Sequence, residues 1–265
     1  DTDRSRGLGD VYKRQPLKYA SVIKWFTNMR EGIPAYIKID MATQNTELVK
    51  LSEGMKYTTS DHFNRNIYRH LRFNYPTYIF NDLSFEIDED GVPYWICPVK
   101  KYNIGLFGGT TIGRVVLCNA ITGETKDYAV EDVPQWVDRV YSADLLVELY
   151  NYHGTLKHGF FNSVLGQKDC LNTTDGYNYL AIDDDVWVYT GVTSITGDQS
   201  NVGFVLMNQR TMETKFYEIE GATESSAMSS AEGQVQNLHY TATFPLLLNI
   251  SGEPTYFIAL KDDAG

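Results

Sequence analysis

Runs in which apolar and polar residues alternate recur along the chain, separated by short turn-forming segments. Three of these turns have related sequences, NAITGETKDY (residues 119–128), NQRTMETKFY (208–217) and DMATQNTELV (40–49). Each follows an apolar run rich in β-branched residues and precedes a second alternating run. An Asn or Asp side chain can bond the following amides and start a turn, and a period of two favours half-buried strands. The pattern therefore predicts three β-hairpins.

Helix-like stretches and further hairpins lie between these turns. Helical spacing of apolar residues predicts helices within residues 17–30, 60–73, 131–150 and 225–240. Ser60 and Asp61 are the expected caps of the second helix, because their side chains can accept free amides of a first turn. Additional hairpins are expected to turn at Asp88–Gly91, Asp183–Asp185 and Ser251–Pro254.

One helix followed by two hairpins forms a unit that recurs along the chain. We expect an α+β fold of tandem repeats, truncated at both ends, in which each antiparallel sheet carries a helix on one face. The predicted divisions are an incomplete leading unit (16–58), an αββββ repeat (59–130), a second αββββ repeat (131–219) with an insertion (151–175), and a truncated third repeat (220–265).

Residues 1–15 differ from the rest of the chain in texture. The stretch SRGLGDVYKRQ (Ser5–Gln15) matches, residue for residue, the translation of a transposase-based sequencing adapter. Translated tags are excluded from fold reasoning. We therefore predict that residues 1–15 are not native and that the genuine chain begins near Pro16. Any signal peptide or membrane tether is then expected upstream of Pro16.

Composition narrows the function only slightly. The formal net charge of −11 disfavours nucleic acid or an anionic membrane as a partner over a whole face. No apolar run approaches the roughly 18 residues of a membrane span. The spacings of Cys97, Cys118 and Cys170 match no zinc or redox motif. Cys97 and Cys118 lie in apolar runs, so we expect buried free thiols.

A search for catalytic and metal-binding patterns gives no coherent set. Ser60, Asp61 and His62 are adjacent, whereas triad residues converge from separate places in the sequence. The DEDG turn lacks the glutamate of a calcium loop, and GLFGGTTIG (105–113) lacks the strand–loop–helix context of a nucleotide site. We predict no catalytic residue, cofactor or metal ligand, while weak divalent binding at Asp183–Asp185 stays open.

The insertion at 151–175 is the best candidate for a binding function. It departs from the repeat, and long loops on a rigid scaffold often carry function. The favoured alternative is that it packs on the sheet as a small extra helix, because aromatic pairs are usually buried. The candidate partner-binding residues are Phe107 in the glycine-rich loop and, in the insertion, His153, His158, Phe160 and Phe161.

The hairpin motif, an apolar strand followed by an Asn/Asp-x-x-Thr-Gly-Glu turn, resembles the strand–turn–strand of PepSY-type domains, clearest at residues 119–128. Those small domains pair a helix with an antiparallel sheet and occur in peptidase propeptides and envelope proteins. The stretches EGIPAYIKIDM, HLRFNYPT, FEIDEDGVPYW and ATFPLLLN also resemble an uncharacterised group of membrane-anchored proteins of Gram-positive gut bacteria, loosely labelled colicin V production-type. This resemblance implies an extracytoplasmic, membrane-associated location and no established catalytic residues.

Three hypotheses of function follow. The first is a non-catalytic extracytoplasmic repeat module for protein or peptide interaction at the cell envelope, with strand addition as one binding mode. The second is a hydrolase or peptidase-related enzyme fragment that uses His62, His153 or His158 with nearby acids. The third is a carbohydrate-binding module with exposed aromatic residues, which burial of Trp95, Trp136 and Trp187 would count against.

Overall fold

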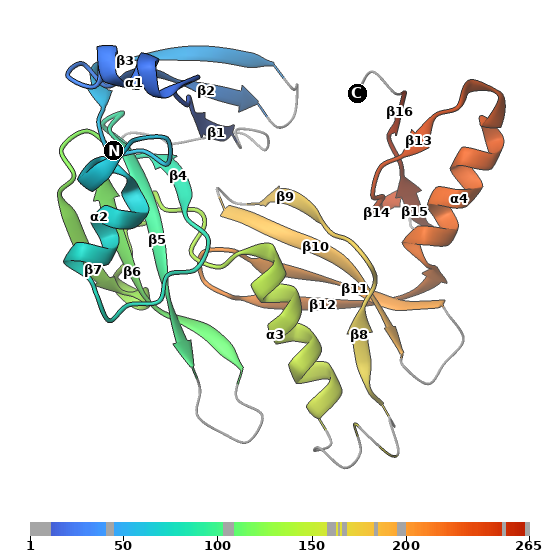
Figure 1. Cartoon of the computed structure of the whole chain (residues 1–265). Helices are drawn as coiled ribbons and strands as arrows, with labels where there is room; N and C mark the ends of the chain where they lie inside the picture. Colours follow the sequence, from blue (N-terminus) through green and yellow to red (C-terminus); the bar gives the residue numbers. More distant parts are fainter. Residues whose placement is uncertain are drawn as a thin grey trace, which may run out of the picture. The chain divides into compact units, whose positions relative to one another are not determined.

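The computed structural model of the chain is an α+β protein in which helices and antiparallel sheets alternate along the sequence (Figure 1). It describes residues 12–40, 45–102, 109–157, 163, 165, 169–182, 185–194, 200–250 and 253–262. The chain divides into two compact units, Asp1–Ser142 with Ala181–Asp185, and Ala143–Leu180 with Val186–Gly265. The α+β class expected from the sequence is confirmed.

The first unit begins with a three-stranded antiparallel sheet in the order β1-β2-β3. Its elements are β1 (Tyr12–Pro16), α1 (Val22–Asn28), β2 (Ile33–Asp40) and β3 (Thr46–Met55). Four residues of β1 belong to the segment predicted to be a translated adapter, and they pair with β2. Strand pairing uses backbone groups that nearly every residue carries, so the pairing does not test the origin of that segment.

A helix and a four-stranded antiparallel meander complete the first unit. They are α2 (Ile67–Asn74), β4 (Ser84–Ile87), β5 (Pro93–Tyr102), β6 (Thr110–Asn119) and β7 (Thr125–Ala129), with strand order β4-β5-β6-β7. Ile67 and Leu71 of α2 belong to one buried cluster with Trp95 of β5. Tyr36 of β2 joins this cluster beside Phe85, with ring centroids 6.0 Å apart. The two sheets of this unit therefore share a core.

The start of α2 differs from the expectation. Asn66 caps the helix, because its side chain accepts a hydrogen bond from the Arg69 amide (3.3 Å). The prediction that Ser60 and Asp61 cap it is wrong. Asp61 is buried instead and accepts hydrogen bonds from Trp25 Nε1 (2.8 Å) and Thr58 Oγ1 (2.7 Å). The Asp61 carboxylate, which the local sequence pattern predicts to cap α2, therefore bonds Trp25 of α1 instead.

The helix expected within residues 131–150 is shorter than predicted. A 3₁₀ turn occupies Val130–Asp132, and α3 spans only Ala143–Leu156. Between them, the backbone amides of Asp138 and Arg139 donate to the buried carboxylate of Glu86, at 2.9 and 3.1 Å. These amides are held by Glu86 of β4 rather than by helical carbonyl groups, so the segment before α3 forms turns and bends instead of a helix.

The second unit contains α3 and a five-stranded antiparallel sheet. The strands are β8 (Leu171–Thr173), β9 (Asn178–Ile182), β10 (Asp185–Ser194), β11 (Ser200–Asn208) and β12 (Thr214–Ala222). The order is β12-β11-β10-β8, and β9 also pairs with β10. The described residues of the predicted insertion include the end of α3 and strand β8, which pairs with β10, and Ser163 and Leu165 have a helical backbone. The other residues from 158 to 168 lie outside the described part, so the small extra helix expected there stays a prediction.

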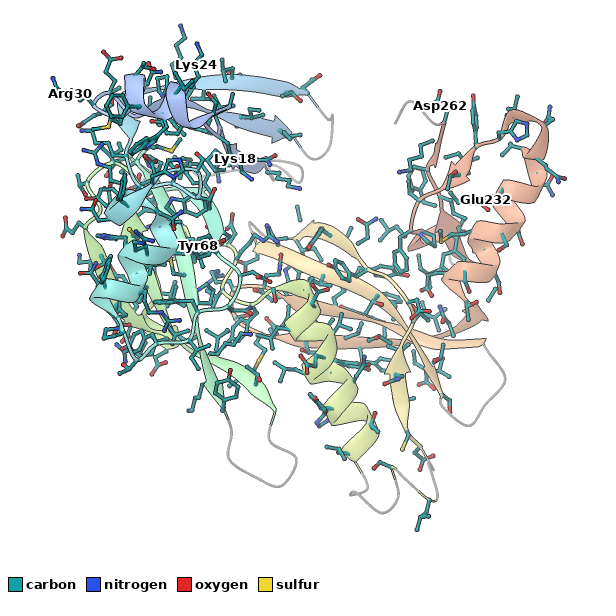
Figure 2. All side chains as sticks on the ribbon, viewed as in Figure 1. Lys18, Lys24, Arg30, Tyr68, Glu232 and Asp262 are labelled. Atoms are coloured by element: carbon teal, nitrogen blue, oxygen red, sulfur yellow. The ribbon has the colours of Figure 1, made fainter. Side chains whose placement is uncertain are left out.

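The unit ends in a helix and short strands. These are α4 (Glu224–Gln234), β13 (Thr241–Ala242), β14 (Leu246–Ile250), β15 (Glu253–Phe257) and β16 (Leu260–Lys261). Strands β14 and β15 form a hairpin, and β13 pairs with β16. Glu232 extends from α4 and accepts the Ala242 amide at 2.8 Å, which ties the helix to β13 (Figure 2).

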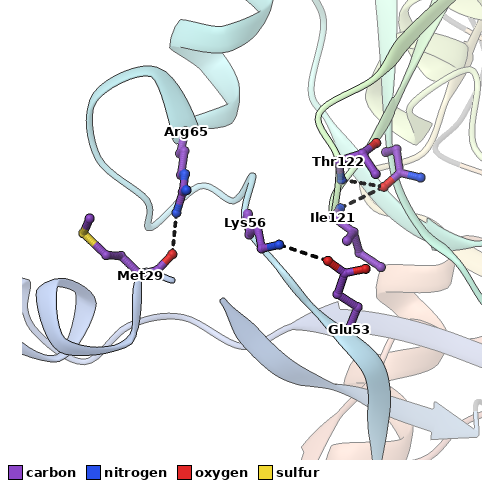
Figure 3. Close-up of polar contacts among 7 residues, drawn as sticks. Met29, Glu53, Lys56, Arg65, Ile121 and Thr122 are labelled. Carbon is purple, nitrogen blue, oxygen red and sulfur yellow. Dashed lines mark hydrogen bonds and ion pairs between the residues drawn. The ribbon is translucent and has the colours of Figure 1, made fainter. Parts of the chain in front are cut away.

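The two clearest copies of the hairpin motif form the same turn. Asn119 Oδ1 accepts hydrogen bonds from the amides of Ile121 (2.9 Å) and Thr122 (3.0 Å), which Figure 3 shows. Asn208 accepts from the amides two and three residues further on, at 2.8 and 3.0 Å. Hairpins β6–β7 and β11–β12 confirm these two turns. In the third copy, residues 41–44 lie outside the described part, although β2 and β3 pair on either side.

All three cysteines are buried and none forms a disulfide, as the sequence predicts for Cys97 and Cys118. Burial raises the pKa of the Cys118 thiol to about 12 and raises that of the Cys97 thiol well above its ordinary value. Both therefore stay protonated in the neutral range, and they behave as small apolar residues of the first core.

Candidate binding pocket

An apolar pocket of about 540 Å³ lies in the second unit between α3 and β12. We call it the α3–β12 pocket. One face of the helix forms a wall, through Leu146, Leu149, Tyr150, His153, Gly154 and Lys157. The opposite wall consists of Leu171, Met212, Thr214 and Phe216. The helical residues follow a spacing of three and four, which places them on a single face.

Close contact at one end of α3 sets the shape of this pocket. A Cβ added at Gly154 would lie 2.5 Å from the Leu171 carbonyl oxygen, so only glycine allows the helix to approach β8 this closely. Asn151 then bonds both groups of Thr173: its Oδ1 accepts the backbone amide (2.8 Å), and its Nδ2 donates to the hydroxyl (3.1 Å). The helix is fixed at β8, and the space opens on the side of β12.

Strand β12 is an exposed edge of the sheet. Among the described strands it pairs only with β11, and its residues from Thr214 to Glu218 are exposed. Thr214 and Phe216 face the pocket. Lys215 and Tyr217 lie on the opposite face, where Lys215 Nζ is 4.6 Å from the Trp187 ring centroid and Tyr217 stacks on Phe204. An unpaired edge thus borders an apolar pocket.

Met212 lines the pocket from a strained backbone position. Its φ is +64°, in the left-handed region that long side chains rarely adopt, and the side chain is 42% exposed. The equivalent residue of hairpin β6–β7 is Gly123, with φ +77°. A non-glycine residue in this region costs about 1–2 kcal/mol. Such strain clusters at binding sites, and here it places an apolar side chain at the pocket.

The charge at the pocket is opposite to that of the unit around it. The second unit has thirteen Asp and Glu against five Lys and Arg. Among the described lining residues none is acidic, whereas His153 and Lys157 are both present and exposed. Burial raises the pKa of Tyr150, so its hydroxyl stays neutral and available for hydrogen bonding. The pocket is therefore suited to an apolar group accompanied by an anionic one.

The structure places one of the predicted binding residues at this site. His153 lies on the pocket wall. Phe107, His158, Phe160 and Phe161 lie outside the described residues. Sequence reasoning missed Met212 and Phe216, although one signal was present: a methionine occupies the motif position that holds glycine in the clearest copy.

Two alternatives for the site lose part of their support. Trp95 and Trp187 are each 4% exposed and Trp136 is half-buried, so they do not form the exposed aromatic row of a carbohydrate-binding surface. For the enzyme hypothesis, the acid next to His62 in the sequence is Asp61, and its carboxylate accepts a hydrogen bond from Trp25 Nε1. In the part of the chain that the structure describes, no three His, Cys, Asp or Glu residues come together as metal ligands.

Comparisons of the chain with models of protein families, with curated proteins and with solved structures gave no match. No described helix has both the length and the apolar composition to cross a membrane. The site must therefore be interpreted from its own residues.

Proposed function

We propose that the chain is a non-catalytic module of tandem PepSY-like repeats that binds an extended peptide segment of a partner protein. The location proposed for this activity is extracytoplasmic, at the cell envelope, as the sequence resemblance implies. The single observation that carries the proposal is the exposed edge strand β12 beside the α3–β12 pocket.

An unpaired strand edge offers backbone donors and acceptors to another chain. A peptide that adds to β12 presents every second side chain on the face of Thr214 and Phe216, because side chains alternate across a strand. Those side chains enter the α3–β12 pocket. Backbone pairing then supplies affinity, and the pocket supplies specificity, as in other complexes formed by strand addition.

Charge complementarity defines the occupant further. Apolar side chains of the peptide meet Leu146, Leu149 and Phe216, while an acidic side chain meets His153 and Lys157. An acidic peptide is repelled by most of the second unit, so the two basic residues select a register rather than attract from a distance. The proposed ligand is an extended segment with alternating apolar residues and one Asp or Glu.

The first test is selection from a phage-displayed library of random peptides on the immobilised full chain. We expect the enriched peptides to share apolar residues at alternate positions and one acidic residue. Replacing Phe216 by serine should weaken binding of an enriched peptide about tenfold or more, because it removes the apolar pocket wall. Phe257→Ser is the matched control, since Phe257 is a 63% exposed strand residue of the same unit. Failure to enrich any peptide, or equal binding by both variants, would contradict the proposal.

A charge exchange tests the register. Lys157→Glu should weaken binding of the enriched acidic peptide several-fold, and replacing the peptide's acidic residue by lysine should restore it. Fluorescence polarisation with the labelled peptides measures both effects. If the two substitutions act independently of each other, Lys157 does not face the acidic group.

Met212→Gly separates binding from stability. Glycine relieves the left-handed backbone but loosens the unfolded chain, so the net gain in unfolding free energy is about 0.5 kcal/mol. Peptide binding should nevertheless weaken, because the variant loses an apolar side chain at the pocket. Urea unfolding and fluorescence polarisation report the two effects. A variant that loses both stability and binding would show that Met212 supports the hairpin instead.

A further inference from the structure

A buried polar cluster fastens the C-terminal segment of the second unit to its sheet. It consists of Asn201 on β11, Glu224 in the first turn of α4 and Tyr256 on β15. Asn201 Nδ2 donates to Glu224 Oε1 and to the Tyr256 hydroxyl, both at 2.9 Å. That hydroxyl donates to the Ala222 carbonyl at 2.6 Å. The cluster thus joins three elements that lie apart in the sequence.

Two oxygens of this cluster accept no hydrogen bond from the part of the chain that the structure describes. They are Asn201 Oδ1 and Glu224 Oε2, on side chains that are 2% and 1% exposed. Among the described residues, no ion pair involves Glu224. Burial, followed by the charge of Glu224, raises the pKa of Tyr256 to about 12, so this phenol is neutral. A buried acceptor without a donor destabilises the fold, because it has lost its hydrogen bonds with water.

The backbone leaves room for this carboxylate. A Cβ added at Gly191 would lie 2.2 Å from Glu224 Oε1, so the carboxylate rests directly on the glycine of β10. Asn201 and Glu224 lie on two different elements, and their bonded atoms fix the two side chains side by side. The free Oδ1 and Oε2 belong to the same two polar groups, and both are withdrawn from water.

We infer that a small hard metal cation of the sodium or calcium class binds at Asn201 Oδ1 and Glu224 Oε2. An amide oxygen and a carboxylate oxygen are ligands that such cations prefer over nitrogen or sulfur sites. One carboxylate balances a monovalent ion fully and a divalent ion in part. The cation satisfies both acceptors and strengthens the attachment of α4 and β15 to the sheet. This site is separate from the α3–β12 pocket and does not depend on the proposed function.

The test measures the unfolding midpoint of the full chain after removal of metal ions. Sodium, calcium and magnesium chlorides are compared with choline chloride at equal ionic strength. We expect a rise of about 2–4 °C with sodium or calcium over choline, since a ligand of the folded state stabilises by mass action. Glu224→Gln should remove this response, while Glu218→Gln, at an exposed acid of the same unit, should keep it. Equal midpoints in all salts, or a response that Glu224→Gln retains, would overturn the inference.

Asn201→Asp gives a result in the opposite direction. A second carboxylate beside Glu224 destabilises the chain in choline chloride through like-charge repulsion. Calcium should restore the variant and bind it more tightly than the parent chain, because an anionic ligand replaces a neutral one. Terbium luminescence, sensitised through Tyr256 and Tyr189, follows this binding directly. If calcium does not restore the variant, the two oxygens are met by a proton or a water molecule, and the cation site is excluded.

Discussion

Replacing Gly123 by alanine should lower the free energy of unfolding of the first unit by about 3 kcal/mol. Its φ of +77° lies in the left-handed region, where a side chain costs about 1–2 kcal/mol. A Cβ at this position would also lie 2.3–2.7 Å from the ring of Tyr57. Overpacking of a core of this kind costs about 1–3 kcal/mol more.

The expected loss of stability is large because the Tyr57 ring packs directly on the turn that contains Gly123. Tyr57 lies against His70 of α2, with ring centroids 4.6 Å apart, and His70 Nε2 is 2.8 Å from the Gly123 carbonyl oxygen. The ring therefore cannot move away without disturbing the helix. The amides of Lys56 and Tyr57 also bond the Ala120 carbonyl, at 2.8 and 2.9 Å. Any shift in the turn is transmitted to the connection between β3 and α2.

Urea unfolding of Gly123→Ala and of the parent chain measures this effect. Gly91→Ala is the matched control, because its φ is +81° but, apart from its chain neighbours, no atom of the described residues lies within 4 Å of the added Cβ. The control should lose only the backbone component, about 1–2 kcal/mol. Equal losses in the two variants would show that contact with Tyr57 contributes nothing.

The first unit should lose stability as the pH rises from about 4.5 to about 7. Burial, and next the charge of Asp138, raise the pKa of Glu86 from 4.5 to about 7, although the two backbone amides that it accepts oppose the shift. The folded state then holds a proton that the unfolded state has already released. Stability from this group is complete below about pH 4.5, falls through this window, and is constant above pH 7. The difference amounts to about 3 kcal/mol.

The substitution Glu86→Gln tests the origin of this slope. Glutamine cannot ionise, so the pH dependence between about 5 and 8 should largely disappear. One oxygen can still accept an amide, whereas the other amide loses its acceptor, so the variant should be less stable than the parent at acidic pH. Urea titrations at several pH values compare the two chains. A slope that persists in the variant would assign it to another group, of which Asp61 is the first to examine because burial raises its pKa too.

Much of the fold was predictable because its signals are local. The Asn119 and Asn208 turns rest on hydrogen bonds within three residues, and alternating runs mark the strands on either side. The α+β class and the buried cysteines follow from the same patterns. The start of α3 was not predictable. The residues just before it, Asp138 and Arg139, bond Glu86, which lies about fifty positions earlier in the sequence. Pro134 and the apolar spacing gave no indication of that contact.

The candidate binding site divides in the same way. His153 was singled out from the composition of the insertion, and it lies on the wall of the α3–β12 pocket. The apolar partners Met212 and Phe216 come from a hairpin about sixty residues later, and only folding brings them opposite α3. Their motif also occurs at Gly123, so its pattern alone does not distinguish a packed turn from one that lines a pocket.

By itself, the sequence determined where hairpins turn, which class of fold results and which thiols are buried. These properties depend on the alternation of side chains and on polar groups that bond their own neighbours in the chain. Only the tertiary structure decided that Asp61 supports Trp25, that Glu86 holds the segment before α3, and that Glu224 meets Asn201. Each of these buried carboxylates has at least one partner from 23 to 53 residues away, because a group removed from water needs a donor wherever the fold supplies one.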